Sequence, residues 1–244
     1  MTVSEANSLM AYLESFVTPQ RLAKIDVALV QRTRHIAVVA EDFHDPHNAS
    51  ALLRTCDAMG IQDVHVVENY NTFKARVGAA SGATKWVTRH QYSDPEAANT
   101  LVCCDKLRSQ GYLIVATSPH LNALPPEAMP LDQKLAVIFG SERDGVSQRA
   151  IAVADYQLKI PMVGFVESLN VSVSAAVCLY TMTQRLRSLE IAWQLSDRDK
   201  QALRLDWIRQ SIQNSAALER FYWQEAGTTS QPDSLKQIER APND

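Results

Sequence analysis

Three segments of the chain carry residue types that bind anions or a small polar ligand. The first, residues 44–55, has the pattern of a helix with Asn48 near its cap and Arg54 six residues later. Arg54 falls on the face opposite the apolar side chains. It either forms an ordinary surface ion pair with Asp57, or it faces a cleft and binds an anionic substrate.

The second segment, residues 139–147, follows an apolar run and contains two glycines and three charged side chains, among them Glu142. In an open parallel sheet, ligands bind beyond the carboxyl ends of the strands, so a turn at this place suits a ligand. The alternative is a plain connection between a strand and a helix, with Ser147 as the helix cap.

The third segment, residues 160–176, begins with an apolar loop after Pro161 and continues into a helix rich in small residues. Backbone N–H and C=O groups of such a loop suit adenine or another small heterocycle. The alternative is that Ser168 or Asn170 simply caps the helix.

Several common catalytic patterns are absent from the sequence. There is no G-x-G-x-x-G for a dinucleotide, no G-x-S-x-G for a hydrolase and no H-E-x-x-H for zinc. Gly140 and Gly145 have the spacing of a phosphate-binding loop, but the lysine that such a loop requires is missing. His44 and His47 are separated by Pro46, which indicates a turn, and no metal site is expected there.

The elements that must position these segments alternate along the chain. Short apolar runs predict strands over 36–40, 64–67, 86–88, 112–117, 135–139 and 157–160. Helical spacing predicts helices over 5–16, 19–31, 48–59, 96–110, about 170–188 and twice within 197–225, with helical turns over 147–153. Strands alternating with helices indicate an α/β fold with a mostly parallel sheet that helices cover on both faces.

Composition narrows the class of protein. The 244 residues are 46% hydrophobic, with no apolar run long enough for a spanning helix, which needs about 18 residues, and no secretory signal pattern. The four cysteines form no C-x-x-C pair, so a reduced, cytoplasmic protein is expected. The net charge of −3 removes the simplest argument for a nucleic-acid partner but leaves room for a local basic patch.

These three segments, in this order, resemble the three motifs of the TrmH/SpoU family of RNA 2′-O-ribose methyltransferases, which belongs to the SPOUT superfamily. The likeness is greatest to the branch that methylates guanosine 18 of tRNA, and it extends over roughly residues 19–225. The matching residues are Asn48, Arg54 and Thr55 in the first motif, 139–142 and 145–147 in the second, and 160–162 and 168–174 in the third.

The resemblance implies a sheet whose C-terminal part is tied in a trefoil knot, a rare exception to the usual rules of chain topology. It implies a methyltransferase domain over 35–190, an N-terminal helical segment over 1–34 that supports RNA binding or dimerisation, and a C-terminal helical extension over 191–226. The polar residues 227–244 are expected to be disordered. The family acts as a homodimer, so a homodimer is expected here.

The resemblance also implies the chemistry, which is methyl transfer from S-adenosylmethionine to a ribose 2′-oxygen. Arg54 would be essential, binding RNA phosphate and stabilising charge on that oxygen, while the proton acceptor stays open. Asn48, Glu142, Ser168 and Asn170 would position Arg54 and the ribose. By position, the cofactor pocket would be lined by Thr117, Gly140, Ile160 and Leu169.

An RNA surface is expected between residues 69 and 93, a stretch that contains four lysines and arginines and no acidic residue. These four are Lys74, Arg76, Lys85 and Arg89, and a merely solvated face is the alternative. Arg21, Lys24, Arg32 and Arg34 add basic charge near the N-terminus. Neither a membrane nor DNA is expected as a partner.

Two other functions remain open from the sequence. The same chemistry can act on another tRNA nucleotide or on rRNA, although only about 34 residues precede the first expected strand, too few for an added RNA-binding domain. A knotted module that binds RNA without catalysis is the alternative from a different class. A generic nucleotide-binding protein is disfavoured because the chain has no glycine-rich phosphate loop.

Overall fold

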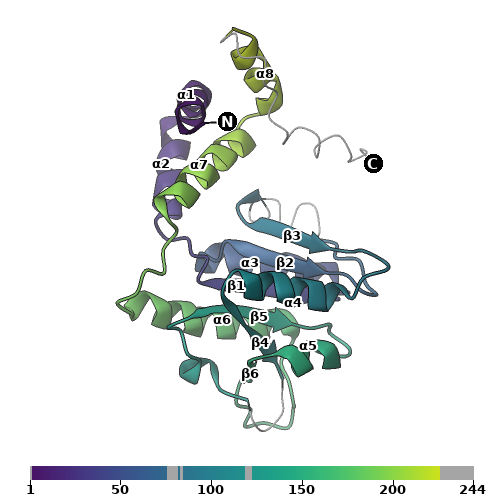
Figure 1. The fold of residues 1–244 in the computed structure, drawn as a ribbon. Helices are drawn as coiled ribbons and strands as arrows, with labels where there is room; N and C mark the ends of the chain where they lie inside the picture. Colours follow the sequence, from purple (N-terminus) through teal and green to yellow (C-terminus); the bar gives the residue numbers. More distant parts are fainter. Residues whose placement is uncertain (1, 76–81, 83–84, 119–122, 226–244) are drawn as a thin grey trace. The chain divides into compact units, whose positions relative to one another are not determined.

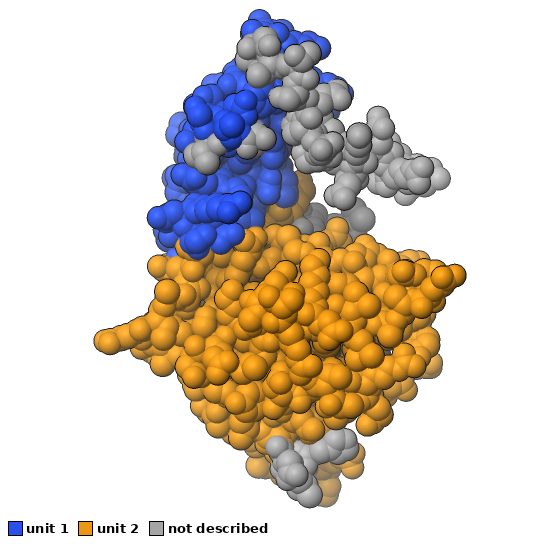
Figure 2. Space-filling model, viewed as in Figure 1, with its two compact units in different colours: residues 1–30, 196–244 blue, residues 31–195 orange. Residues whose placement is uncertain are grey.

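The computed structural model describes residues 2–75, 82, 85–118 and 123–225. Arg76, predicted to bind RNA, lies outside the described residues. The same holds for the tail 227–244, which was predicted to be disordered. The chain forms two compact units (Figure 2). Residues 31–195 make the larger one, and the described parts of 1–30 and 196–244 make the other.

The larger unit is built on a six-stranded sheet in which every pairing is parallel (Figure 1). The strand order is β3-β2-β1-β5-β4-β6. Because all pairings are parallel, the carboxyl ends of the six strands lie along the same edge of the sheet. The strands are β1 (Ile36–Glu41), β2 (Asp63–Val67), β3 (Thr88–Tyr92), β4 (Tyr112–Thr117), β5 (Lys134–Phe139) and β6 (Tyr156–Leu158).

Helices cover both faces of this sheet, as the apolar strands predict. Successive side chains of a strand point to opposite faces, and in β1 both sets are buried: Val38 packs in one core cluster and Val39 in the other. The first cluster includes side chains of α3 (Pro46–Met59) and α6 (Val171–Ser188), and the second includes those of α4 (Asn99–Ser109) and α5 (Gln148–Val153). Figure 1 shows α4 and α5 together on one face of the sheet.

The third strand differs from its prediction. The apolar pair Trp86 and Val87 indicated a strand over 86–88, whereas the observed strand is Thr88–Tyr92. It lies at the edge of the sheet and pairs only with β2, so Arg89 and Gln91 stay exposed while Tyr92 is buried. An edge strand with one covered face carries no continuous apolar run, and the sequence pattern therefore misplaced it.

The smaller unit combines the two ends of the chain, which the sequence suggested as separate segments. It contains α1 (Val3–Glu14), α2 (Pro19–Leu29), α7 (Asp197–Ser211) and α8 (Ser215–Glu225). Arg204 of α7 pairs with Glu14 of α1 and with Asp26, whose oxygen is 2.8 Å from the arginine Nε. The buried apolar residues of the smaller unit come from both ends of the chain. They are Leu9, Leu13, Val17, Ile25, Leu29, Leu203, Leu205, Trp207 and Ile208. Among the described residues, no helix is both long and apolar enough to cross a bilayer.

Candidate active site

Helix α3 begins two residues earlier than its pattern predicts. Asp45 is the cap, its carboxylate accepts the N–H of His47 at 2.8 Å, and Pro46 occupies the first helical position. Asn48 therefore lies within the first turn, and its buried side chain is free of the capping role. Gly60 ends the helix with φ 79°, a left-handed conformation that glycine adopts readily.

The turn after β5 depends on a glycine. Ser141 and Gly145 exchange two backbone hydrogen bonds, of 3.1 and 3.0 Å, which fold the turn back on itself. Gly140 lies so close beneath this turn that a Cβ there would come within 2.0 Å of the Gly145 carbonyl. Ser147 caps α5, since its Oγ accepts the N–H of Ala150 at 3.2 Å. The cap predicted at Ser147 is confirmed.

A chain of side-chain hydrogen bonds joins all three segments. Asn48 donates from Nδ2 to Oε1 of Glu142 over 2.8 Å. Its Oδ1 accepts a hydrogen bond from Nδ2 of Asn170 over 3.1 Å. The order Glu142–Asn48–Asn170 thus ties the turn after β5, the first turn of α3 and the start of α6 to one another.

Asn170 caps α6 and also takes part in this chain of hydrogen bonds. Its Oδ1 caps α6 by accepting the N–H of Ser172 at 2.9 Å and that of Val173 at 3.4 Å. Its Nδ2 is the group that reaches Asn48. An amide can cap a helix and join a site at once because it carries an acceptor and two donors.

Glu142 is held in its charged form. Partial burial raises the pKa of this carboxyl, but hydrogen bonds to the charged form outweigh that effect and leave the pKa below its usual value. The donors are Nδ2 of Asn48 and the backbone N–H groups of His44, at 3.0 Å, and Asp45, at 3.2 Å. Glu142 is therefore an acceptor that anchors the start of α3.

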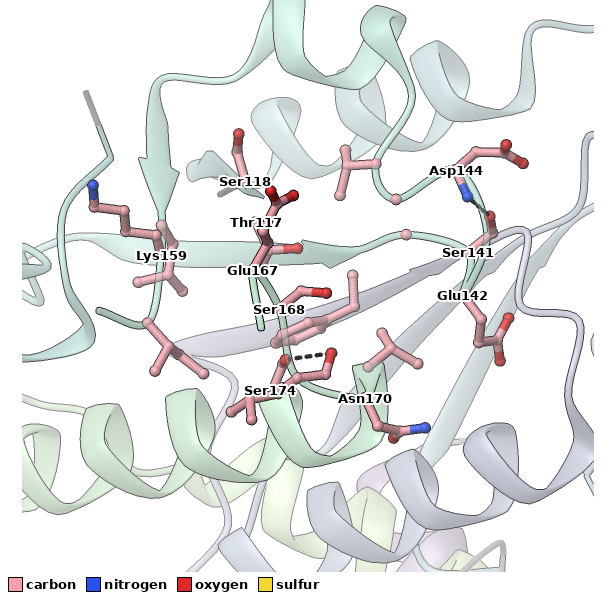
Figure 3. Close-up of a pocket in the computed structure, with 18 of the residues that line it drawn as sticks. Thr117, Ser118, Ser141, Glu142, Asp144, Lys159, Glu167, Ser168, Asn170 and Ser174 are labelled. Carbon is pink, nitrogen blue, oxygen red and sulfur yellow. Dashed lines mark hydrogen bonds between the residues drawn. The ribbon is translucent and has the colours of Figure 1, made fainter. Parts of the chain in front are cut away.

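A pocket of about 580 Å³ opens between the loops that follow β4, β5 and β6. This volume falls in the range of small-molecule sites, which is roughly 300–1,000 Å³. All four residues expected to hold the cofactor line it: Thr117, Gly140, Ile160 and Leu169. In Figure 3, Glu142 and Asn170 lie at one end of the pocket and Lys159 at the opposite end.

The pocket also contains residues that sequence reasoning missed. Ser118, Ser141, Glu167 and Ser174 line it beside the predicted set. Ser141, Glu167 and Ser174 lie within the second and third segments, and Ser118 directly follows the predicted strand over 112–117. The signal was therefore the polar character of strand ends and loops in and beside the motifs. No group of metal-binding side chains gathers in the described part of the chain.

Arg54 occupies a different place from the other predicted catalytic residues. Glu142, Ser168 and Asn170 line the pocket, and Asn48 contacts two of them, but Arg54 is not among the described residues that line it. Arg54 is exposed on α3, about 9 Å along the helix axis from Asn48 at 1.5 Å per residue. Asp57, its expected ion-pair partner, pairs with the buried Arg32.

The described basic residues of the expected RNA surface are all exposed. Lys74 follows β2, Lys85 precedes β3, and Arg89 lies within β3. Because β2 and β3 are parallel, Lys74 is at the carboxyl edge of the sheet and Lys85 at the amino edge. These residues are spread from one end of the outer strands to the other. They do not gather at the end of the sheet where the pocket lies.

Comparisons with known proteins show what this chain is similar to. Residues 35–180 match the model of the SpoU rRNA Methylase family. The chain is 35% identical over 207 residues to a tRNA (guanosine(18)-2'-O)-methyltransferase of Borreliella burgdorferi, covering 85% of this chain and 93% of that one. It is 36% identical over 194 residues to the protein of the same name from Thermus thermophilus, covering 79% and 97%.

A solved structure supports the same relationship. The A. aeolicus TrmH/SpoU tRNA modifying enzyme superposes with a TM-score of 0.70 at 27% identity, over 80% of this chain and 98% of that one. The family model alone spans the sheet, the pocket and the start of α6. This chain belongs to the SpoU rRNA methylase family.

Proposed function

We propose that this protein transfers a methyl group from S-adenosylmethionine to the ribose 2′-oxygen of guanosine 18 in tRNA. The observation that carries the proposal is the hydrogen-bonded chain Glu142–Asn48–Asn170, which gathers three distant segments at one end of a pocket of cofactor size. The choice of substrate follows the names of the relatives, which are tRNA (guanosine(18)-2'-O)-methyltransferases.

The pocket residues fit the proposed cofactor. S-adenosylmethionine supplies an electron-poor methyl group on a sulfonium, together with a heterocycle and a charged amino-acid end. In the wall of the pocket, Thr117, Gly140 and Ile160 lie at or just after strand ends, and Leu169 lies in the loop before α6. Backbone N–H and C=O groups of such segments suit a heterocycle. Carboxylates of Glu142 and Glu167 line the same pocket and provide negative charge beside a cation.

Arg54 acts on the RNA from outside the cofactor pocket. Its guanidinium binds a phosphate next to the target ribose through paired hydrogen bonds. The same charge stabilises the 2′-oxygen as its proton leaves. Ser168 and Asn170, at the pocket, orient the ribose so that its oxygen faces the methyl donor, and such alignment supplies much of the rate.

We propose that tRNA binds across the outer strands through Lys74, Lys85 and Arg89, with Arg76 as a further contact. Three of these side chains are exposed, and they extend from one edge of the sheet to the other. Phosphate contacts of this kind position a nucleic acid without reading its sequence. The four buried free cysteines are consistent with the reducing cytoplasm, where we place the reaction.

We further propose that the C-terminal part of the larger unit is knotted. The loop after β4 contacts two later elements: Leu124 pairs with Leu158 of β6, and Pro126 accepts a hydrogen bond from Arg185 of α6 over 2.7 Å. In a knot, a later part of the chain passes through an earlier loop. The loop after β4 has the contacts that this requires, because it is held by β6 on one side and by α6 on the other.

The proposed homodimer is supported by α6. Val173, Val177 and Tyr180 are 47%, 38% and 56% exposed and follow the i, i+4, i+7 spacing of one helical face. The same helix contributes Ser174 and Cys178 to the pocket on another side. A second copy packed on this apolar face would therefore lie beside the pocket.

Incubation with radiolabelled S-adenosylmethionine and unmodified bulk RNA tests the function. The expected result is label on the ribose of guanosine 18 of tRNA, mapped by nuclease digestion. Label on another tRNA nucleotide, or on rRNA, would keep the chemistry and reject the substrate. Cofactor binding without transfer to any RNA would reject the enzyme in favour of an RNA-binding module.

A further inference from the structure

Glu41 is a buried carboxylate that no motif includes. It is the last residue of β1 and is 2% exposed. Its Oε1 accepts hydrogen bonds from Oγ1 of Thr100 at 2.6 Å and from Oγ of Ser147 at 2.8 Å, and its Oε2 accepts the N–H of Ser147 at 2.8 Å. A buried carboxylate with three donors is well satisfied and holds those donors firmly.

Two of the three donors belong to the last residue of the turn after β5. The neighbours of that residue, Val146 and Gln148, both line the pocket. Ser147 itself does not, because its side chain points to Glu41 and caps α5. The contact with Glu41 therefore sets where this wall of the pocket stands.

Glu41 and Glu142 form crossed contacts between the same two loops. Glu41, at the end of β1, accepts donors from the turn after β5. Glu142, in the turn after β5, accepts the N–H groups of His44 and Asp45, which follow β1. Each loop thus supplies the carboxylate that the other loop's backbone donates to, and neither can shift without breaking contacts at both ends.

We propose that Glu41 is a positioning residue for methyl transfer, which fixes the turn 140–147 and with it the cofactor wall of the pocket. This inference rests on the proposed function. Glu41 acts through Ser147 and touches neither the cofactor nor the RNA. Loss of its charge is expected to weaken S-adenosylmethionine binding, because the turn then samples positions that do not fit the ligand.

The test compares Glu41→Gln with Asp63→Asn. Asp63 is also a buried carboxylate, held by Arg34 at 2.9 Å and His90 at 3.0 Å, but it begins β2 and so lies at the opposite edge of the sheet. Both changes replace a carboxylate by an amide of the same shape. Calorimetric Kd for S-adenosylmethionine, the KM values and Tm are measured for each variant and for the wild type.

Glu41→Gln is expected to raise the Kd and KM for S-adenosylmethionine about tenfold, corresponding to one charge-assisted hydrogen bond of about 1.4 kcal/mol. Asp63→Asn is expected to lower Tm and leave both constants within about twofold, since it acts on stability alone. Equal cofactor constants in Glu41→Gln and the wild type, measured well below Tm, would overturn the inference. A wild-type protein that binds no S-adenosylmethionine would instead reject the proposed function.

Two milder variants keep the inference testable if Glu41→Gln does not fold. Ser147→Ala removes a donor on the pocket side of Glu41, and Thr100→Val removes the donor from α4. The first is expected to raise the Kd about threefold or more, and the second to lower only Tm. Equal effects of the two variants on the Kd would contradict a role specific to the turn.

Discussion

At the scale of single residues, the two asparagines of the candidate site each make two contacts that the donors and acceptor of an amide allow. Asn48 donates to Glu142 and accepts from Asn170, and Asn170 also caps α6. An aspartate in place of either asparagine would lack the amide donor, and at position 48 it would bring a second negative charge to Glu142. Residue identity, and not charge alone, therefore decides whether the three segments meet.

Arg54 is predicted to be essential for transfer and dispensable for cofactor binding. Arg54→Ala should lower kcat at least about a hundredfold, the usual cost of removing a charge-stabilising donor. The Kd for S-adenosylmethionine should stay within about twofold, because Arg54 is not among the described pocket residues. Single-turnover assays and calorimetry measure the two effects, with exposed Arg149 changed to Ala as the control. Full activity of Arg54→Ala would remove this residue from the mechanism.

Gly140 is predicted to tolerate no side chain. A Cβ would come within 2.0 Å of the Gly145 backbone, so Gly140→Ala must displace the turn that carries Glu142. The Kd for S-adenosylmethionine should rise more than about tenfold, because the displaced turn no longer holds the pocket wall in the position that fits the ligand. Gly164→Ala is the matched control, because a Cβ there meets nothing within 4 Å. Equal affinities of the two variants would contradict the role assigned to the turn.

At the scale of elements, apolar pattern located the strands and helices but not the contacts between them. β1 and β5 were recognisable because burial on both faces leaves an uninterrupted apolar run. β3 was misplaced because an edge strand lacks that run. Asp45 as the cap of α3 and Glu41 as the anchor of Ser147 were missed, since a single carboxylate near a strand end has no signature without its partner.

The candidate site was predictable only through its resemblance to a family. Periodicity placed Asn48, Glu142 and Asn170 on three separate segments, and each had an ordinary structural explanation as well. What brings them together is the parallel order β1-β5-β4-β6, which sets the loops after these strands side by side. Long-range pairing of this kind cannot be derived from local sequence pattern.

His65 of β2, which lies beside His90 of β3, is expected to make the free energy of unfolding depend on pH. Burial, and then the nearby His90, lower the pKa of His65 to about 4. In the unfolded chain a histidine binds a proton below about pH 6.5, so stability is full above that pH and falls as pH drops towards 4. Between pH 7 and 5 this histidine should cost about 2 kcal/mol of unfolding free energy.

Urea unfolding of the wild type and of His65→Gln at pH 7 and pH 5 measures that effect. The variant should lose less stability than the wild type over this interval, because it has no proton to bind at position 65. Tyr92, whose hydroxyl lies 3.0 Å from Nδ1 of His65, can still hydrogen-bond to the glutamine. Equal losses in the two proteins would mean that His65 is not held neutral in the folded state.

At the scale of the whole molecule, the proposed dimer links assembly to the site. α6 presents Val173, Val177 and Tyr180 to solvent and lines the pocket with other residues. Val177→Arg should halve the molar mass in solution from twice 27.1 kDa to that of one chain and lower activity. Val102→Arg, on α4, is the control because Val102 is also exposed. Size exclusion with light scattering decides, and a wild-type monomer would refute the dimer.

These residues are proposed to direct a methyl group to one ribose oxygen of tRNA. The most direct measurement compares two synthetic tRNAs that differ only at position 18, one with guanosine and one with 2′-deoxyguanosine. Labelled methyl transfer should occur on the first and be absent from the second, because the base is unchanged and only the accepting oxygen is missing. Equal labelling of both tRNAs would contradict 2′-O-methylation, since the methyl group would then go to a different atom.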